Sequence, residues 1–172
     1  MTVLHTPRLR LEPYAEKHFG GLLALNSDPV VMRHVGGTTD TAEDVRAGIA
    51  RVQARWAAQG FSWWAFLPAG SDEVIGAGCV QHIENDPAQP LEIGWRLRPD
   101  HWGRGLATEA ARAMAEFAFT ALRAPCLYGV ADPGNAASIR VMQRLGMRSI
   151  GLERHYGIDC AVWRLDAPDR QP

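Results

Sequence analysis

The sequence predicts a mixed α/β fold in which helices cover a single sheet, and three observations support this prediction. Runs with strand composition and runs with helical periodicity follow one another in the order β-α-α-β-β-β-α-β-α-β-β. In the middle of the chain a strand, a helix and a second strand occur in succession, which implies parallel strands joined by a right-handed crossover. The 172 residues, 47% of them hydrophobic, suffice for one domain over residues 1–172 with an ordered core from about 7 to 166.

Hydrophobic periodicity assigns the elements of the N-terminal half. We expect a strand over Arg8–Pro13, helices over Ala15–Leu25 and Asp40–Gln59, a short helical piece between them that ends at Met32, and a hairpin of strands over Phe61–Leu67 and Glu73–His82. Asp40 and Glu43 are the expected capping pair of the longest helix. Gly76 and Gly78 indicate either a bulge or a close backbone approach within the hairpin.

The C-terminal half begins with the stretch LEIGWRLRPDHWGRGLATEAAR. It predicts a strand over Leu91–Leu97, a loop that contains Gly103 and Gly105, and a helix from Leu106 to Ala121. Beyond it we expect a strand over Cys126–Ala131, a helix over Asn135–Leu145 that Gly146 ends, closing strands over Met147–Glu153 and Asp159–Asp166, and a disordered tail, APDRQP.

The glycine loop between the central strand and helix has a definite chemical use. Free backbone N–H groups at a helix N-terminus attract phosphate, and glycine lets a ligand approach the backbone closely. The alternative is a tight turn from strand to helix with no ligand, because short glycine motifs also occur for structural reasons. The loop alone leaves both interpretations open.

Charge and cysteine content bound the class of function. The net charge of −1 provides no field that would draw the chain to nucleic acid or to an anionic membrane. The N-terminus lacks the apolar core of a signal peptide, and no segment is long enough to span a membrane. The three cysteines are odd in number and lack C-x-x-C spacing, so we expect no disulfide framework, no metal and a cytoplasmic location. Monomer and homodimer both stay open.

Three stretches together resemble one enzyme family. TPRLRLEP, EIGWRLRPDHWGRGLATEA and NAASIRVMQRLGM are similar to the GCN5-related N-acetyltransferase superfamily, and within it to the branch of ribosomal-protein N-terminal acetyltransferases. The acetyl-coenzyme A loop of the superfamily, Q/R-x-x-G-x-G/A, falls on Trp102–Ala107. Gly105 and Ala107 match this pattern, whereas Trp102 departs from the usual Gln or Arg.

The resemblance implies transfer of acetyl from acetyl-coenzyme A to a primary amine, by direct attack in a ternary complex. Backbone N–H groups of the glycine loop would hold the pyrophosphate, the pantetheine would pair with the end of the central strand, and Arg140 and Arg144 would reach the 3′-phosphate. The residues expected to bind this co-substrate are Leu97, Gly103, Arg104, Gly105, Leu106, Ala107, Thr108, Asn135, Ser138 and Arg140.

Candidate catalytic residues follow from the same comparison. Glu92 would share a face of its strand with Gly94 and Arg96, and a carboxylate inside a core strand is unfavourable unless it is paired or used. It is either the base that deprotonates the amine or the partner of a basic group such as Arg96. Ser138, Tyr156 or solvent would protonate the leaving thiolate. Asn135 is also a sufficient N-cap for its helix without any role in binding.

The acceptor pocket is expected between the N-terminal helices and the hairpin. Trp63 and Trp64 are the candidates to line it, and only one of them can do so because successive strand residues face opposite ways. The acceptor itself stays open between a protein N-terminus and a small-molecule amine. Two other functions compete with acetyl transfer: a nucleotide-binding domain, disfavoured because Thr108 stands where the third glycine belongs, and a catalytically silent acetyl-coenzyme A sensor of the same fold.

Overall fold

A computed structural model describes residues 1–168, which form one sheet of eight strands with helices on it. The strands are β1 Leu4–His5, β2 Leu9–Pro13, β3 Trp63–Pro68, β4 Gly76–His82, β5 Leu91–Leu97, β6 Cys126–Ala131, β7 Arg148–His155 and β8 Ile158–Asp166. The helices are α1 Phe19–Asn26, α2 Pro29–Met32, α3 Ala42–Gln59, α4 Leu106–Thr120 and α5 Ala136–Leu145, with single 3₁₀ turns η1 Glu16–His18, η2 Ile83–Asn85 and η3 Pro99–His101. Apart from the two-residue β1, the order of strands and helices confirms the prediction.

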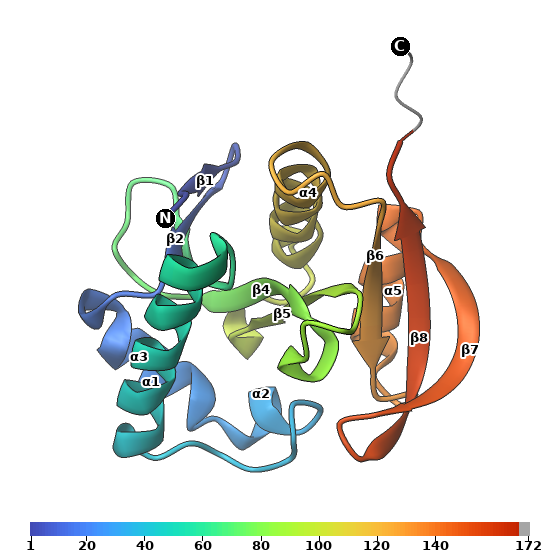
Figure 1. Ribbon diagram of the computed structural model, residues 1–172. Helices are drawn as coiled ribbons and strands as arrows, with labels where there is room; N and C mark the ends of the chain where they lie inside the picture. The colour runs from blue at the N-terminus through green and yellow to red at the C-terminus, as the bar shows by residue number, and fades with distance from the viewer. Residues whose placement is uncertain (169–172) are drawn as a thin grey trace.

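The sheet has the order β1-β2-β3-β4-β5-β6-β8-β7 (Figure 1). Neighbouring strands are antiparallel except β5 and β6, which run parallel as predicted. Helix α4 joins these two strands, contacts β4 and β5, and packs against α5, which in turn lies on β6. In Figure 1, α4 stands above β4 and β5 while α1 and α2 lie below them, so helices cover both sides of the middle of the sheet.

The two sides of β5 have different chemistry. On the side of α4, Leu97 lies in an apolar layer with Phe66 and Met114, all of them buried. On the other side, Glu92 bonds to a side chain of β4, and Arg96 covers a ring of β3. The sequence prediction that Glu92 and Arg96 share a face is therefore confirmed.

The glycines of β4 permit close backbone approach. A Cβ atom at Gly78 would lie 2.5 Å from Phe66 Cζ and 2.7 Å from the carbonyl oxygen of Gly94. The register of β4 with β3 and with β5 continues without interruption through Gly76 and Gly78. Of the two predicted explanations, close approach is correct and a bulge is wrong.

The start of α3 corrects the predicted capping pair. The N-cap is Thr41, whose Oγ1 accepts from the Asp44 N–H at 3.2 Å, while Asp44 Oδ2 accepts from the Thr41 N–H at 2.9 Å. A threonine hydroxyl serves this position as well as a carboxylate, so the capping box forms one residue later than Asp40 and Glu43 would place it. Asp40 instead accepts from Asn26 Nδ2 at 2.8 Å.

Element ends also differ from the prediction by a few residues. The helix expected from Ala15 starts as η1 and continues as α1, and both hairpin strands begin later than expected, at Trp63 and Gly76. Of the tail predicted to be disordered, Ala167 donates its N–H to the carbonyl of Pro125 at 2.9 Å, which makes that part of the prediction wrong. The last four tail residues, 169–172, lie outside the described residues. Within residues 1–168, every helix is too short or too polar to cross a bilayer.

Candidate active site

A gap in the sheet separates β5 from β6. The two strands pair at one position, Glu92 opposite Tyr128. On its other edge β5 pairs with β4 along its whole length, Leu91–Leu97. Beyond Glu92, the β5 edge that faces β6 therefore has backbone groups that no described strand pairs. The parallel strands diverge toward their carboxyl ends, which is where open sheets of this kind bind ligands.

The N-terminus of α4 lies beside this gap and is not capped by a side chain. Gly103 and Gly105 adopt left-handed backbone conformations, with φ of 73° and 77°. Gly105 is the N-cap, and no described side chain accepts from the first turn of the helix. Thr108 is buried in that turn, and its Oγ1 has no hydrogen-bond partner within residues 1–168. Free N–H groups, the helix dipole and a free hydroxyl fit an anion such as phosphate.

Trp102, which departs from the usual loop residue, fixes the loop to the strand. Its ring is 51% exposed, and its Nε1 donates to the carbonyl of Leu97 at 2.8 Å. The loop is also held from the N-terminal segment, because Arg8 donates to the carbonyl of Arg104 at 2.9 Å. The Arg104 side chain itself is exposed. The glycine loop is thus held by the side chains of Trp102 and Arg8, while its own N–H groups stay available.

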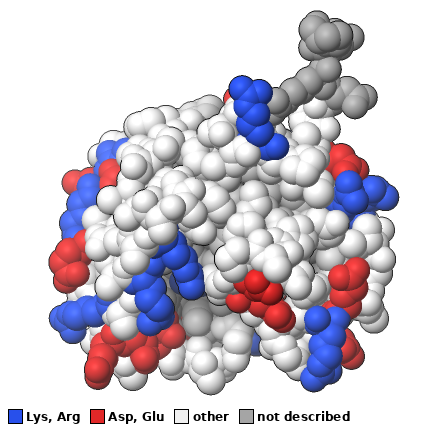
Figure 2. All heavy atoms as spheres, viewed as in Figure 1, with Lys and Arg blue, Asp and Glu red and all other residues white. Residues whose placement is uncertain are grey.

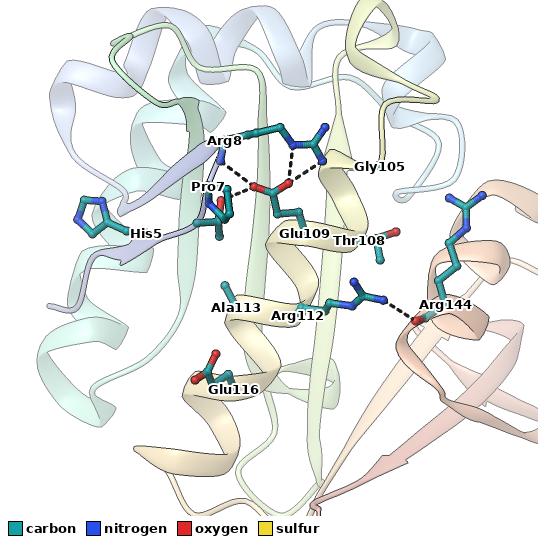
Figure 3. Close-up of a pocket in the computed structure, with 11 residues that line it drawn as sticks. His5, Pro7, Arg8, Gly105, Thr108, Glu109, Arg112, Ala113, Glu116 and Arg144 are labelled. Carbon is teal, nitrogen blue, oxygen red and sulfur yellow. Dashed lines mark hydrogen bonds and ion pairs between the residues drawn. The ribbon is translucent and has the colours of Figure 1, made fainter.

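An open pocket of about 690 Å³ runs along α4 from Gly105 past Thr108 to Glu116 (Figure 3). Residues 5–8 form one wall, and Arg144 at the end of α5 stands opposite. Arg112 crosses the pocket and donates to the carbonyl of Arg144 at 3.2 Å, which joins α4 to α5.

The arginines that line this pocket differ in whether they form an ion pair with a carboxylate. Arg8 forms an ion pair with Glu109 at 2.6 Å, whereas Arg112 and Arg144 form none with a described carboxylate. Arg140 is exposed on α5 and does not line the pocket. Arg112 and Arg144, which line the pocket, are therefore better placed than Arg140 to meet an anion at the uncapped turn of α4.

Glu92 is 7% exposed and has two side-chain partners. Its Oε1 accepts from Gln81 Nε2 at 2.7 Å and from the hydroxyl of Tyr156 through a short hydrogen bond. Burial raises the pKa of Glu92, and these two hydrogen bonds oppose that shift. The alternative prediction of an ion pair with Arg96 is wrong, because Arg96 lies over the Trp63 ring, with its guanidinium carbon 4.7 Å from the centroid.

Tyr156 reaches Glu92 from the far end of the chain. It sits in the turn between β7 and β8 with φ of 53°, a left-handed conformation that is unusual for a residue with a side chain. Its hydroxyl accepts from the Glu84 N–H at 2.9 Å, and the Glu84 carboxylate accepts from the Tyr156 N–H. Burial and the neighbouring Glu92 raise the pKa of Tyr156, so the phenol stays protonated at neutral pH. The sequence predicted neither this contact nor the part played by Gln81.

A second pocket, of about 150 Å³, lies on the Glu92 side of the sheet between α3 and β5. Trp63 lines it, and its Nε1 donates to Gln81 Oε1 at 2.8 Å, which links the pocket to Glu92. Trp64 faces the opposite way, fully buried against Phe117 with ring centroids 5.4 Å apart. Of the two residues predicted to line the acceptor pocket, Trp63 lines this one. The prediction for Trp64 is wrong, because successive strand residues face opposite ways and the Trp64 side chain points into the core.

Comparison with known proteins now decides the family. Residues 8–148 match the family described as the acetyltransferase (GNAT) domain. The chain belongs to this family. It is 30% identical over 160 residues to the uncharacterized N-acetyltransferase p20 of Bacillus licheniformis, covering 91% of this chain and 88% of the relative. The acetyltransferase is therefore an acetyl-coenzyme A-dependent acyltransferase, as the resemblance implied.

Solved structures agree with this assignment. The acetyltransferase of Agrobacterium tumefaciens has a TM-score of 0.82 and 30% identity, with 96% of this chain and 94% of that chain covered. The ribosomal L7/L12 alpha-N-protein acetyltransferase RimL, in complex with coenzyme A, has a TM-score of 0.80 and covers 96% of this chain and 98% of its own. Its 16% identity shows the shared fold alone.

In this acetyltransferase, β6 leads directly to the remaining predicted site residues. Asn135 is the N-cap of α5, and its Oδ1 accepts from the Ser138 N–H at 3.1 Å. The capping interpretation of Asn135 is therefore correct, and the Asn135 amide nitrogen stays available for a ligand. The Ser138 side chain is half-buried in the first turn. The structure thus brings Glu92 and Tyr156 into direct contact. Ser138 lies on α5, the helix that follows β6 across the gap from β5.

Proposed function

We propose that the enzyme transfers acetyl from acetyl-coenzyme A to a primary amine, by direct attack of the amine on the thioester in a ternary complex. The observation that carries this proposal is the gap between β5 and β6. It opens beside the uncapped N-terminus of α4 and has buried Glu92 at its closed end. One ligand would meet phosphate-binding N–H groups and an open strand edge, and a second would meet a buried carboxylate.

The co-substrate would be held mainly by backbone groups. The N–H groups of residues 103–108 and the free hydroxyl of Thr108 would bind the pyrophosphate. The pantetheine would pair with the open edge of β5 as far as Leu97, and the Asn135 amide would bond to it from the other wall. Arg112 and Arg144, which line the pocket, would meet the phosphate groups, and the exposed Arg104 and Arg140 would contribute charge from the surface.

Glu92 would act as the base. An amine arrives largely as an ammonium ion and must lose a proton, to the carboxylate directly or through water, before its lone pair attacks the thioester carbon. A backbone N–H of β5 facing the carbonyl oxygen would stabilise the tetrahedral oxyanion. Formation of the C–N bond gives this oxyanion, and its collapse breaks the C–S bond. The thiolate leaves, and the nitrogen loses its second proton to solvent to give the amide. A carboxyl whose pKa is raised by burial is matched to accepting the first proton near neutral pH.

The leaving thiolate would be protonated by Ser138. Tyr156 is the weaker candidate because its hydroxyl already donates its proton to a hydrogen bond with Glu92. We therefore assign Tyr156 to positioning Glu92. We also propose that the enzyme works in the cytoplasm, which its three free thiols, Cys79, Cys126 and Cys160, support.

The test is release of free coenzyme A thiol in the presence of a panel of amines. The panel contains protein N-terminal peptides, amino acids, polyamines and aminoglycosides, and the expected result is turnover with at least one class. Thermal shift by acetyl-coenzyme A is measured in parallel, since a ligand that binds the folded state raises the melting temperature. Binding of acetyl-coenzyme A without turnover of any amine would replace this proposal by the silent sensor.

A further inference from the structure

We infer that the pocket beside Trp63 selects an amine that carries an anionic group, a carboxylate or a phosphate, a few bonds from the reacting nitrogen. This inference rests on the proposed acetyl transfer and adds the chemical class of the acceptor. Three kinds of observation support it: the guanidinium groups that line the pocket, their excess over its carboxylates, and buried donors that have no partner.

Guanidinium groups reach this pocket from two elements. Arg51 and Arg55 come from α3, and Arg96 comes from β5. Within residues 1–168, none of the three forms an ion pair with a carboxylate. Figure 2 shows basic side chains over α3 on one side of a hollow and acidic side chains over the segment after β4 on the other. A molecule with one cationic and one anionic end is complementary to this arrangement.

The two carboxylates of the pocket, Asp40 and Asp44, balance part of this positive charge. Asp40 Oδ2 accepts from Asn26 Nδ2 at 2.8 Å. Asp44 Oδ2 accepts from the N–H and the hydroxyl of Thr41, as part of the cap of α3, and these bonds lower the pKa of Asp44. Arg51 lies close enough to Asp44 to contribute to that shift, so its charge is partly balanced. The three guanidinium groups outnumber these two carboxylates, so the pocket keeps a net positive charge, and Arg55 and Arg96 are the groups placed to meet a ligand.

Buried polar atoms in this pocket have no partner. Tyr14 is 6% exposed, and its hydroxyl has no hydrogen-bond partner within the described chain; the same holds for Asn26 Oδ1 and Arg96 Nε. Arg96 is close enough to hold the pKa of Tyr14 down against burial, without the geometry of a hydrogen bond to the hydroxyl. The pKa of Tyr14 is nevertheless raised to about 12, so the hydroxyl remains a donor. Buried polar groups are normally paired, and an anion would pair with the two donors among them, the Tyr14 hydroxyl and Arg96 Nε.

The spacing on β5 sets the distance between the two ends of the acceptor. Glu92, Gly94 and Arg96 follow one another on the same face, about 6–7 Å apart at each step of two residues. An amine over Gly94, where no side chain occupies the strand, would lie beside Glu92 and place a group a few bonds away at Arg96. The pocket volume of about 150 Å³ suits a small acceptor end rather than a long chain.

Matched amines test the selection. The kcat/KM for thiol release is measured with 4-aminobutanoate, 3-aminopropylphosphonate, butylamine and 1,4-diaminobutane. We expect the carboxylate or the phosphonate to exceed butylamine by about 10–100-fold, the usual worth of one or two charge-assisted hydrogen bonds. The anionic amine with the higher kcat/KM shows whether the pocket prefers a carboxylate or a phosphonate. Equal values for all four, or a preference for the diamine, would overturn the inference.

Variants locate the effect. Arg55→Gln and Arg96→Gln should each reduce the ratio of 4-aminobutanoate to butylamine by about tenfold. Arg46→Gln is the control, because Arg46 lies on the same helix but stacks on Phe19, with its guanidinium carbon 4.2 Å from the ring centroid. It should leave the ratio as it is. Should Arg96→Gln fail to fold, Arg55→Gln decides, and an unchanged ratio in it would contradict the inference.

Binding separates this inference from the proposed reaction. Calorimetry in the presence of coenzyme A, which carries no acetyl group to transfer, compares the affinities of 4-aminobutanoate and butylamine. A preference for the amino acid that disappears in Arg55→Gln, with no acetylation of any amine, would refute acetyl transfer and still support anion selection. Turnover of amines with no preference in binding or in kcat/KM would support acetyl transfer and refute anion selection.

Discussion

The co-substrate side and the acceptor side of β5 are built from different parts of the chain. Near the cofactor loop the groups that we propose to face the ligand are mainly backbone groups, the N–H groups of residues 103–108 and the open edge of the strand, from one continuous stretch. On the acceptor side, they are side chains from four separate elements: Trp63, Gln81, Glu92 and Tyr156. A backbone site tolerates changes of side chain but not of backbone conformation, whereas a side-chain network has the opposite sensitivity.

The largest expected effect is on the backbone side. Gly105→Val should abolish the rise in melting temperature caused by acetyl-coenzyme A, because Gly105 has φ of 77° and a Cβ there stands where phosphate meets the helix. At a ligand concentration of 100 Kd the wild type should gain about 2.7 kcal/mol of stability. The measurement is a thermal melt with and without acetyl-coenzyme A.

Gly60→Val is the matched control for backbone strain. Gly60 ends α3 with φ of 79°, and a Cβ there meets no atom within 4 Å, so this variant carries similar strain far from the loop. It should lower the melting temperature and keep the full shift with acetyl-coenzyme A. A folded Gly105→Val protein that is still stabilised by acetyl-coenzyme A would remove the phosphate site from this loop.

On the side-chain side, Glu92→Gln should lower kcat/KM by about 10²–10⁴-fold, the usual contribution of general base catalysis. It should also flatten the acidic limb of the pH profile, because the base is active only when deprotonated. Affinity for acetyl-coenzyme A should stay the same, since in the proposed function the acetyl-coenzyme A and the amine meet different groups of β5. Glu43→Gln, at an exposed carboxylate of α3, should change neither quantity. An unchanged pH profile in Glu92→Gln would leave Glu92 a structural role only.

The same variant should be more stable than the wild type at neutral pH. Burial raises the pKa of Glu92 in the folded state, so the folded state holds the proton more tightly than the unfolded state. The stability that this proton contributes is present at low pH and is lost as pH rises through the folded-state pKa. Glutamine does not ionise and avoids that loss. Chemical denaturation at pH 5 and pH 8 should show a gain for Glu92→Gln that is larger at pH 8.

This contrast also explains which parts could be predicted from sequence. The fold and the loop Trp102–Ala107 follow from local patterns: periodicity, glycine positions and the strand that precedes a helix. Which residues of β5 share a face follows from the alternation of side chains along a strand. The wrong details were local choices between similar residues, such as Thr41 instead of Asp40 as the N-cap of α3. Sequence reasoning works where neighbouring residues form the structure.

The acceptor side was hidden because its contacts join distant residues. Tyr156 and Glu92 are 64 positions apart, and Gln81 and Trp63 are 18 apart. Nothing local distinguishes Gln81 from any other polar residue of a strand. The register of β4 with β5, which pairs Gln81 with Glu92, could have suggested the contact once the hairpin was placed. The position of Tyr156 depends on a turn with a left-handed backbone, which no pattern in the sequence indicated.

A smaller effect is expected where both kinds of group meet, at the start of α5. Ser138→Ala should lower kcat by about 10–100-fold, at the low end of general acid catalysis, because a thiolate with a pKa near 8.5 is already a tolerable leaving group. The melting shift with acetyl-coenzyme A should stay, since the backbone N–H of Ser138, which bonds to Asn135, is unaffected. Steady-state kinetics at saturating acetyl-coenzyme A measures this. A rate equal to the wild type would assign the proton to solvent.

The smallest effect, and the sharpest test of the side-chain network, is expected from Tyr156→Phe. The Tyr156 hydroxyl bonds to Glu92 and lowers the pKa of that carboxyl against the effect of burial. Without this bond the pKa of Glu92 rises further, so the acidic limb should move to higher pH. The loss in kcat/KM should be about 3–10-fold on that limb, the worth of one hydrogen bond, and should fade as pH rises above it. A tyrosine that protonates the thiolate would instead lose rate equally at every pH, and that outcome would return the role of acid to Tyr156.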